Sequence, residues 1–389
     1  MAIAAPPPPP PASAAPALKL EMANGTNIKF GLLVQPQFQV AGTTAGSGYA
    51  ENLFVRRTRI LIGGSVMGIF DYFFDTDFPN IGQASAVPAN AMAMTPASTT
   101  KATPGLNVQD IFVTWKAAGD AFKVDIGYML PPQSHNALQG AGTLYGWDYY
   151  AFSFLHGNGF GQNALSPVGR DTGLQIRGLV AGGMLEYRLG AFQGIRSLAV
   201  AGGDPASSNM PRFAARVQLN LMDAEPGFFY AGTYLGKKKI VSVGASFDYQ
   251  KNPVSGSSFD DAYHTFDVDA FVDMPLGEGV LTVQDDFVGW HGGTMIPGLP
   301  KWTETIEAGY NITSAMISPI VRYERRWGGT AMVNGMPADL ATIDRYAVGV
   351  GYWPFGHNVN VKLFYSRIQE QGAAHGANQV NAQLQLYFF

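Results

Sequence analysis

The last nine residues of the chain read Asn381-Ala382-Gln383-Leu384-Gln385-Leu386-Tyr387-Phe388-Phe389. Polar and apolar residues alternate along this stretch, and it stops on an aromatic pair. A β-strand in which every second residue is apolar has one apolar face and one polar face. The same alternation runs through residues 28–40 near the other end of the chain. Strands of this kind are typical of a barrel that faces lipid outside and water inside.

The composition agrees with this interpretation. The chain has 389 residues, of which only 14% are charged, too few for the surface of an ordinary soluble protein. Its mean hydropathy is nevertheless close to zero, far below that of a helical membrane protein. No stretch approaches the roughly 18 uninterrupted apolar residues of a membrane-spanning helix. Alternating strands explain both observations, because only half of each strand has to be apolar.

Charge and cysteine content exclude other classes of protein. The net charge of -4 gives no support to nucleic-acid binding. The absence of cysteine rules out a disulfide framework and thiolate metal sites. We therefore expect neither a cofactor nor a metal nor a nucleic-acid partner.

Residues 1–26 form an Ala/Pro-rich segment whose run of prolines, Pro6 to Pro11, favours a semi-rigid polyproline II spacer. We interpret the segment as a periplasmic tether below the barrel. It has neither the basic start nor the apolar middle of an export signal, so we expect that such a signal has been removed.

Residues 27–389 then contain sixteen predicted strands separated by connections of two kinds. The strands are 27–40, 52–66, 69–77, 106–116, 121–128, 170–180, 184–193, 211–221, 238–249, 263–274, 280–290, 302–311, 316–327, 344–353, 358–368 and 379–389. Short turns rich in Gly, Pro and Asp alternate along the chain with longer loops. The alternation predicts a short turn at residues 222–237, but this connection is long. We interpret it as an elaborated turn.

This parity predicts an all-β, transmembrane antiparallel β-barrel of about sixteen strands. Its short turns would be periplasmic and its long loops extracellular, with both termini on the periplasmic side of a bacterial outer membrane. Five of the six tryptophans fall at or beside predicted strand ends, where such rings prefer the level of the lipid headgroups. These are Trp115, Trp290, Trp302, Trp327 and Trp353.

Five stretches of the chain are distinctive: Val55-Arg56-Arg57-Thr58-Arg59-Ile60, Gly68 to Tyr72, Asp110 to Val113, Gly169 to Gln175 and Leu185 to Gly194. Together they resemble the phosphate-selective porins of the O and P type, a family of bacterial outer-membrane porins. The likeness extends over about residues 27–389. It implies a sixteen-stranded homotrimeric porin whose third long loop folds into the lumen. We expect outer-membrane lipid, lipopolysaccharide and small charged solutes as its partners.

The alternation also assigns the charges that point into the lumen. The basic candidates are Lys29, Arg57, Arg59, Arg177, Arg188, Arg212, Arg216, Lys238, Arg322, Arg326, Arg345 and Lys362. The acidic candidates are Asp71, Asp75, Asp267, Asp269, Asp273, Asp286 and Glu307. Residues 170–238 are mostly basic and residues 263–311 mostly acidic, so the lumen should carry a transverse field that steers charged solutes. Two interpretations stay open: the charges select ions, or they only keep the interior hydrated.

The third long loop, residues 129–169, is the predicted constriction. It contains no lysine or arginine, which departs from the resemblance, since phosphate capture needs several converging cations. It offers His135, Trp147, Asp148, Tyr149, Tyr150, Phe152 and His156. An aromatic constriction predicts sieving of small solutes, with any anion preference coming from the wall arginines.

Other classes of function remain as alternatives. A barrel hydrolase could use Asp285, Asp286 and His291 at the extracellular rim, but no group is visible that would orient the histidine. A scaffold barrel around a partner protein would need a wider lumen and a less charged wall. A soluble β-protein would need charged outward faces, which are largely missing here.

Overall fold

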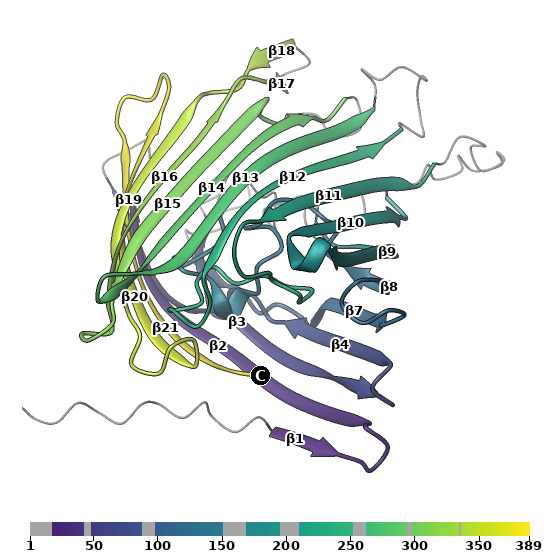
Figure 1. Cartoon of the computed structure of the whole chain (residues 1–389). Coiled ribbons are helices and arrows are strands. Elements are labelled where there is room, and N and C mark those ends of the chain that lie inside the picture. The colour runs from purple at the N-terminus through teal and green to yellow at the C-terminus, as the bar shows by residue number, and fades with distance from the viewer. Residues whose placement is uncertain are drawn as a thin grey trace, which may run out of the picture.

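The computed structural model describes residues 18–42, 48–87, 98–150, 169–194, 210–251, 262–293, 298–333 and 336–389. One sheet of seventeen strands contains the short strand β1 and sixteen antiparallel strands that close into a barrel (Figure 1). The sixteen are β2 Asn27–Gly42, β3 Tyr49–Val66, β4 Phe70–Asp77, β7 Asn107–Trp115, β8 Lys123–Met129, β9 Asp171–Val180, β10 Leu185–Phe192, β11 Arg212–Asn220, β12 Ile240–Gln250, β13 Tyr263–Leu276, β14 Gly279–His291, β15 Trp302–Ile312, β16 Ile317–Trp327, β19 Ile343–Tyr352, β20 Val359–Glu370 and β21 Ala377–Phe388. The predicted barrel and its strand number are confirmed.

The barrel closes between its first and last strands. Strand β21 pairs with β2 from Leu32↔Phe388 to Ala41↔Gln379. Beyond the C-terminus, β1 (Leu18–Glu21) continues along the same edge of β2, with Leu18 opposite Phe30. This short strand lies within the Ala/Pro-rich segment.

The connections differ at the two ends of the barrel. Most connections at one end are tight, as in residues 67–69, 277–278 and 313–316, and we call this the short-turn end. Two loops at the other end contain hairpins that the sequence did not predict. These are β5 (Ala84–Val87) with β6 (Ser98–Lys101), and β17 (Thr330–Val333) with β18 (Met336–Asp339).

Helices are scarce in the described part of the chain. It contains two short 3-10 helices, η1 Ala141–Thr143 and η2 Ala181–Gly183. Among the residues described, no helix has both the length and the apolar character needed to cross a membrane.

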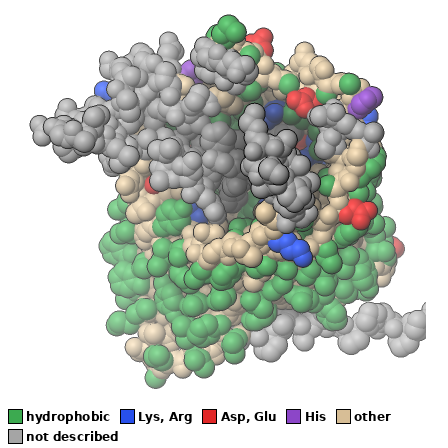
Figure 2. Space-filling view, turned by 180° about the vertical axis from the view of Figure 1, so that it is seen from behind, with side chains coloured by type: hydrophobic (Ala, Val, Ile, Leu, Met, Phe, Trp, Pro, Cys, Tyr) green, Lys and Arg blue, Asp and Glu red, His purple; other side chains and the backbone are tan. Residues whose placement is uncertain are grey.

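The outer wall of the barrel is apolar, and the inner wall is polar. Along β16, outward Val321 is 56% exposed, whereas the next residue, Arg322, points inward and is 3% exposed. Figure 2 shows the outward hydrophobic side chains as a continuous green surface over the lower part of that view. Period-two alternation thus separates a face suited to lipid from a face suited to water.

Five of the six tryptophans lie at or beside strand ends, as predicted, but not all of their rings point outward toward the lipid headgroups. Trp115, Trp302 and Trp327 lie at ends of strands. Trp290 and Trp353 are buried inside the barrel instead, where their ring N–H groups donate to Thr303 and Ser318 at 3.0 Å. The even position of Trp290 in β14 turns its ring inward, so these two rings stabilise the interior.

Two segments fold from opposite ends into the lumen. Residues 130–150 enter from the long-loop end, between β8 and β9. Residues 222–239, between β11 and β12, enter from the short-turn end, and we call them the inward segment. The interpretation of this segment as an elaborated turn did not include its inward course: it reaches the first segment, and an isolated parallel bridge joins Tyr230 to Gln139.

Candidate functional site

Residues 130–150 cross the lumen as a buried strap, with most of their side chains shielded from solvent. Near its start, the strap is held by acidic residues of the wall. The Ser134 hydroxyl donates to Asp286 at 2.9 Å, and the His135 amide donates to Asp269 at 3.2 Å. The predicted acidic side of the lumen therefore serves partly as an acceptor surface for this strap.

The far end of the strap is held by arginines of the opposite wall. The Asp148 carboxylate accepts from Arg56 Nε at 2.9 Å and forms an ion pair with Arg57. Burial alone would raise the pKa of Asp148, but the charges of Arg56 and Arg57 outweigh burial and hold it well below its usual range. Arg322 donates to the Asp148 backbone carbonyl at 3.0 Å and lies over the Trp147 ring. These aromatic and acidic residues thus contact the basic wall.

Polar wall residues also bind backbone carbonyls in the middle of the strap. Lys362 Nζ donates to the carbonyls of Leu144 and Gly146 at 2.7 and 2.8 Å. Gln385 Nε2 donates to the Gly142 carbonyl at 2.8 Å. Lumen side chains therefore satisfy backbone groups that have no ladder partner, which fixes the path of the strap.

The inward segment contacts the strap through a buried polar group. Glu225 accepts from Tyr234 at 2.6 Å, and its carboxylate lies 3.0 Å from His135 Nε2. Burial raises the pKa of Glu225, but His135, Tyr234 and Lys238 together lower it more, and the net pKa lies below the ordinary value. The carboxylate consequently stays charged inside the barrel at neutral pH.

Tyr230 lies at the point where the two segments meet. Its amide donates to the Leu138 carbonyl at 3.0 Å, and its own carbonyl accepts from the Gly140 amide at 3.0 Å. Its ring stacks on His135 with the centroids 4.6 Å apart and lies 4.6 Å from the Arg188 guanidinium. Two segments that enter the barrel from opposite ends thus meet inside it.

The structure places most of the predicted lumen residues inside the barrel, where they are buried. This group comprises Arg57, Arg59, Arg177, Arg188, Arg212, Arg216, Arg322, Lys362, Asp75, Asp267, Asp269, Asp273, Asp286 and Glu307. Lys29, Asp71, Lys238, Arg326 and Arg345 are only partly buried. Lys238 lies in the inward segment and not in a strand, since β12 begins at Ile240. Phe152 and His156 lie outside the described residues.

Wall arginines form ion pairs with nearby carboxylates. Arg212 pairs with Asp248, Arg216 with Asp269 and Arg322 with Glu307. Such pairs neutralise much of the field that a basic sector would otherwise project into the lumen. Asp248 on β12 was not among the predicted residues, although its alternation with Ser246 and Gln250 marks it as inward.

Residues from three of the stretches that carry the resemblance to the O and P type porins meet on one part of the wall. Arg59 on β3 binds Asp75 at 3.1 Å, and Arg170 beside β9 binds Asp110 at 2.8 Å. Asp75 and Asp110 are direct partners in the β4–β7 pairing. These four residues form a buried ion-pair cluster, a grouping that their separation in the sequence did not reveal.

The three residues considered for a hydrolase do not come together. Asp285 lies on the outer face of β14, whereas Asp286 points inward to Ser134. His291 is at the end of the strand and stacks on His264 with a centroid distance of 4.4 Å. Within the described ranges, no group of three or more His, Cys, Asp or Glu residues is arranged to hold a metal ion.

Comparison with solved structures shows which fold this is. Pseudomonas putida OprB, in its high-pH structure, aligns with a TM-score of 0.58 and 11% identity over 94% of each chain. The chain has the fold of the outer-membrane porins. DcaP, an outer-membrane channel of Acinetobacter baumannii, gives 0.55 and 11% identity over 95% of this chain and 99% of that one. Salmonella typhi OmpF, solved in complex with daunomycin, gives 0.54 and 13% identity over 95% and 100%. No protein-family model and no curated protein sequence matches the chain.

Proposed function

We propose that this protein is an outer-membrane porin that lets small solutes diffuse passively through a water-filled lumen. The observation that carries the proposal is the combination of an apolar outer wall with a charged inner wall in a closed barrel of sixteen strands. A barrel of this width leaves an aqueous interior. Its short-turn end and both termini would then face the periplasm.

The strap and the inward segment would set the size limit of the channel. They fill part of the cross-section between them and leave two adjoining cavities beside β2, β3 and β4, of about 440 and 470 Å³. Both cavities are lined in part by Asp71, Tyr72, Phe73 and Phe389. We therefore place the solute path in this sector of the barrel and expect it to admit small molecules only.

The charges around this path favour anions. Six basic residues line the two cavities, against the two acidic residues Asp71 and Asp75; the six are Lys19, Lys29, Arg59, Lys123, Arg170 and Arg177. Five of these six cations pair with carboxylates, which weakens the field. The pairs are Lys19 with Glu21, Arg59 with Asp75 and Asp77, Lys123 with Asp120, Arg170 with Asp110 and Arg177 with Asp125. A weak preference for anions follows, and not tight capture of phosphate, because the strap from 130 to 150 supplies no lysine or arginine.

The resemblance to the O and P type porins implies a homotrimer, and one feature of the outer wall supports it. Glu304, Arg325 and Asp344 form a charged group on the outer face of β15, β16 and β19, with Arg325 Nε 3.7 Å from Asp344. The group lies one or two residues from the ends of these strands, where a charge that faces lipid costs about 0–1 kcal/mol. Covering this group with a second subunit would reduce that cost.

The alternative of a scaffold barrel for a partner protein is less consistent with this interior. The chain's own segments occupy the space that a second polypeptide would need. The charged inner wall is also bound to these segments, as Lys362 and Arg322 show.

Swelling of proteoliposomes in solutes of graded size tests the proposal. We expect swelling with small solutes and its loss as size increases, together with faster migration of the unheated protein on SDS gels. The matched control is the heat-denatured protein in the same lipid. A folded, heat-modifiable barrel that admits no solute would contradict the proposal.

A further inference from the structure

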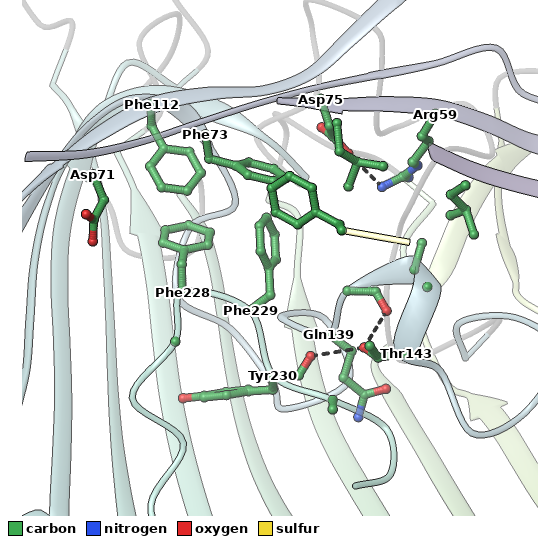
Figure 3. Close-up of a pocket in the computed structure, with 18 of the residues that line it drawn as sticks. Arg59, Asp71, Phe73, Asp75, Phe112, Gln139, Thr143, Phe228, Phe229 and Tyr230 are labelled. Atoms are coloured by element: carbon green, nitrogen blue, oxygen red, sulfur yellow. Dashed lines mark hydrogen bonds and ion pairs between the residues drawn. The ribbon is translucent and has the colours of Figure 1, made fainter. Parts of the chain in front are cut away.

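The larger of the two cavities has an aromatic wall that a simple water-filled pore does not need. Phe73 of β4 and Phe112 of β7 point inward from the barrel, and Phe228 and Phe229 face them from the inward segment (Figure 3). The ring centroids are 5.3 Å apart for Phe73 and Phe229 and 4.3 Å apart for Phe112 and Phe228. The lumen wall of a porin is ordinarily polar, so a cluster of phenylalanines there calls for an explanation.

Packing of the inward segment against the wall accounts for only part of this cluster. Phe112 and Phe228 are buried against each other, at 5% and 8% exposed. Phe73 and Phe229 are only partly buried, and so is Phe389, whose ring lies 5.6 Å from that of Phe73. These three rings keep part of their surface at the cavity of about 440 Å³. An apolar molecule that covered them would release water from that surface.

The charged side chains of the same cavity are already neutralised by one another. Each of the six that line it is held in an ion pair, and the four basic ones are at most 9% exposed. The pairs are Arg59 with Asp75, Lys123 with Asp120, Arg170 with Asp110, Arg177 with Asp125 and Asp71 with Lys116. Figure 3 shows the Arg59–Asp75 pair at the edge of the ring cluster. The described lining therefore offers an ion no unpaired counter-charge to replace its hydration.

The size of the cavity suits a single ring. Its volume of about 440 Å³ lies within the roughly 300–1,000 Å³ of ordinary ligand pockets. Apolar cavities of only about 150 Å³ take up benzene. Ala141 and Gly142 of the strap and Leu61 of β3 complete the lining beside the rings. A flat ring in this space would meet apolar groups of the wall, the strap and the inward segment together.

We propose that this cavity binds a neutral aromatic molecule of one ring, about the size of benzyl alcohol, in contact with Phe73, Phe229 and Phe389. This inference rests on the proposed channel function, since it identifies a class of solute that the channel admits. An anion or an ammonium ion with the same ring would lose hydration without gaining a partner. A saturated ring would lose the edge and face contacts that aromatic pairs make.

Calorimetry on the full-length protein in detergent compares four ligands of similar size. Benzyl alcohol is the proposed ligand, benzoate and benzylammonium add one charge of either sign, and cyclohexylmethanol lacks the aromatic ring. Titration of each compound into detergent alone corrects for uptake by the micelles. We expect saturable heat with benzyl alcohol and dissociation constants at least about tenfold higher for the two ions. Equal affinities for the neutral and charged rings would overturn the proposal, and equal affinity for cyclohexylmethanol would overturn the requirement for an aromatic ring.

Substitutions assign the heat to this cavity. Phe229→Ala should raise the dissociation constant of benzyl alcohol by about tenfold, because one face of the ring site is lost. The matched control is Phe247→Ala, which removes an exposed phenylalanine from the outer wall and should leave the affinity unchanged. Phe73→Leu provides a second, milder variant if Phe229→Ala does not fold. Unchanged affinity in the folded cavity variants would show that benzyl alcohol binds elsewhere.

Chloride current through single channels separates this proposal from the channel itself. We expect benzyl alcohol to reduce the current saturably in the wild type, and about tenfold more to be needed in Phe229→Ala. A protein that binds benzyl alcohol in calorimetry but conducts no ions would contradict the channel and keep the site. A conducting, folded protein that gives no saturable heat with benzyl alcohol would keep the channel and refute the site.

Discussion

Replacing Asp148 by asparagine should loosen the end of the strap that lies against β3. The carboxylate bridges Arg56 and Arg57, and the Arg57 side chain is only 3% exposed. Removing one member of a buried ion pair costs about 3–5 kcal/mol, because the remaining charge stays buried. Since the Asp148 side chain is 21% exposed, we take the lower end, about 3 kcal/mol. That free energy corresponds to a roughly 100-fold larger population of the released strap.

Single-channel recording measures this release. We expect Asp148→Asn to show more frequent transitions and a higher mean conductance than the wild type. Asp148→Glu keeps the charge and is the matched control. The double variant Arg57→Gln with Asp148→Asn should recover part of the loss, because it leaves no buried arginine without a carboxylate.

The pH dependence of the wild type gives an independent check on this ion pair. The pKa of Asp148 is lowered in the folded protein, so its contribution is present above the unfolded value of about 3.9 and is lost only as the pH falls through the lower folded value. Acidification of the wild type to pH 5 should therefore not produce the frequent transitions and higher mean conductance expected for Asp148→Asn. An asparagine variant with wild-type conductance and noise would refute the proposed role of the pair.

Three further outcomes are expected. Arg57→Ala combined with Arg59→Ala should shift the reversal potential toward cations, since fixed positive charge is removed from the wall; an unchanged potential would show that these charges are bystanders. Micromolar phosphate should not block chloride current, because residues 129–169 contain no lysine or arginine. Burial lowers the pKa of His357 to about 4, while a 2.9 Å hydrogen bond from its Nε2 to the Thr233 carbonyl opposes this. The folded barrel thus binds this proton less tightly than the unfolded chain, with its pKa of about 6.5, and thermal stability should fall from pH 6.5 to 4, less so in His357→Gln.

The sequence predicted the barrel because its strands obey a strict period of two. In β16, for example, the alternation around Val321 and Arg322 distinguishes the outward face from the inward face by residue type alone. The parity of short and long connections then indicated the strand number. These signals depend only on residues that are neighbours in the sequence, so they can be recognised without knowing which residues lie across the lumen.

The interior could not be predicted in the same way. Alternation shows that Asp269 points inward, but not that it binds the start of the strap beside Arg216. The inward segment has no periodicity, and only its length at the short-turn end indicated something unusual. Its contact with the strap depends on Tyr230 meeting residues near Leu138, far away in the sequence. Packing across the lumen decides such contacts, and no local pattern encodes it.

The reversal potential of the reconstituted wild-type protein in a potassium chloride gradient tests the central claim most directly. We predict stable single-channel steps and a reversal potential displaced slightly toward the equilibrium potential of chloride, because six basic residues and two acidic residues line the solute path. A folded protein that inserts without conducting ions would contradict the channel. Steps that reverse near the equilibrium potential of potassium would contradict the anion preference.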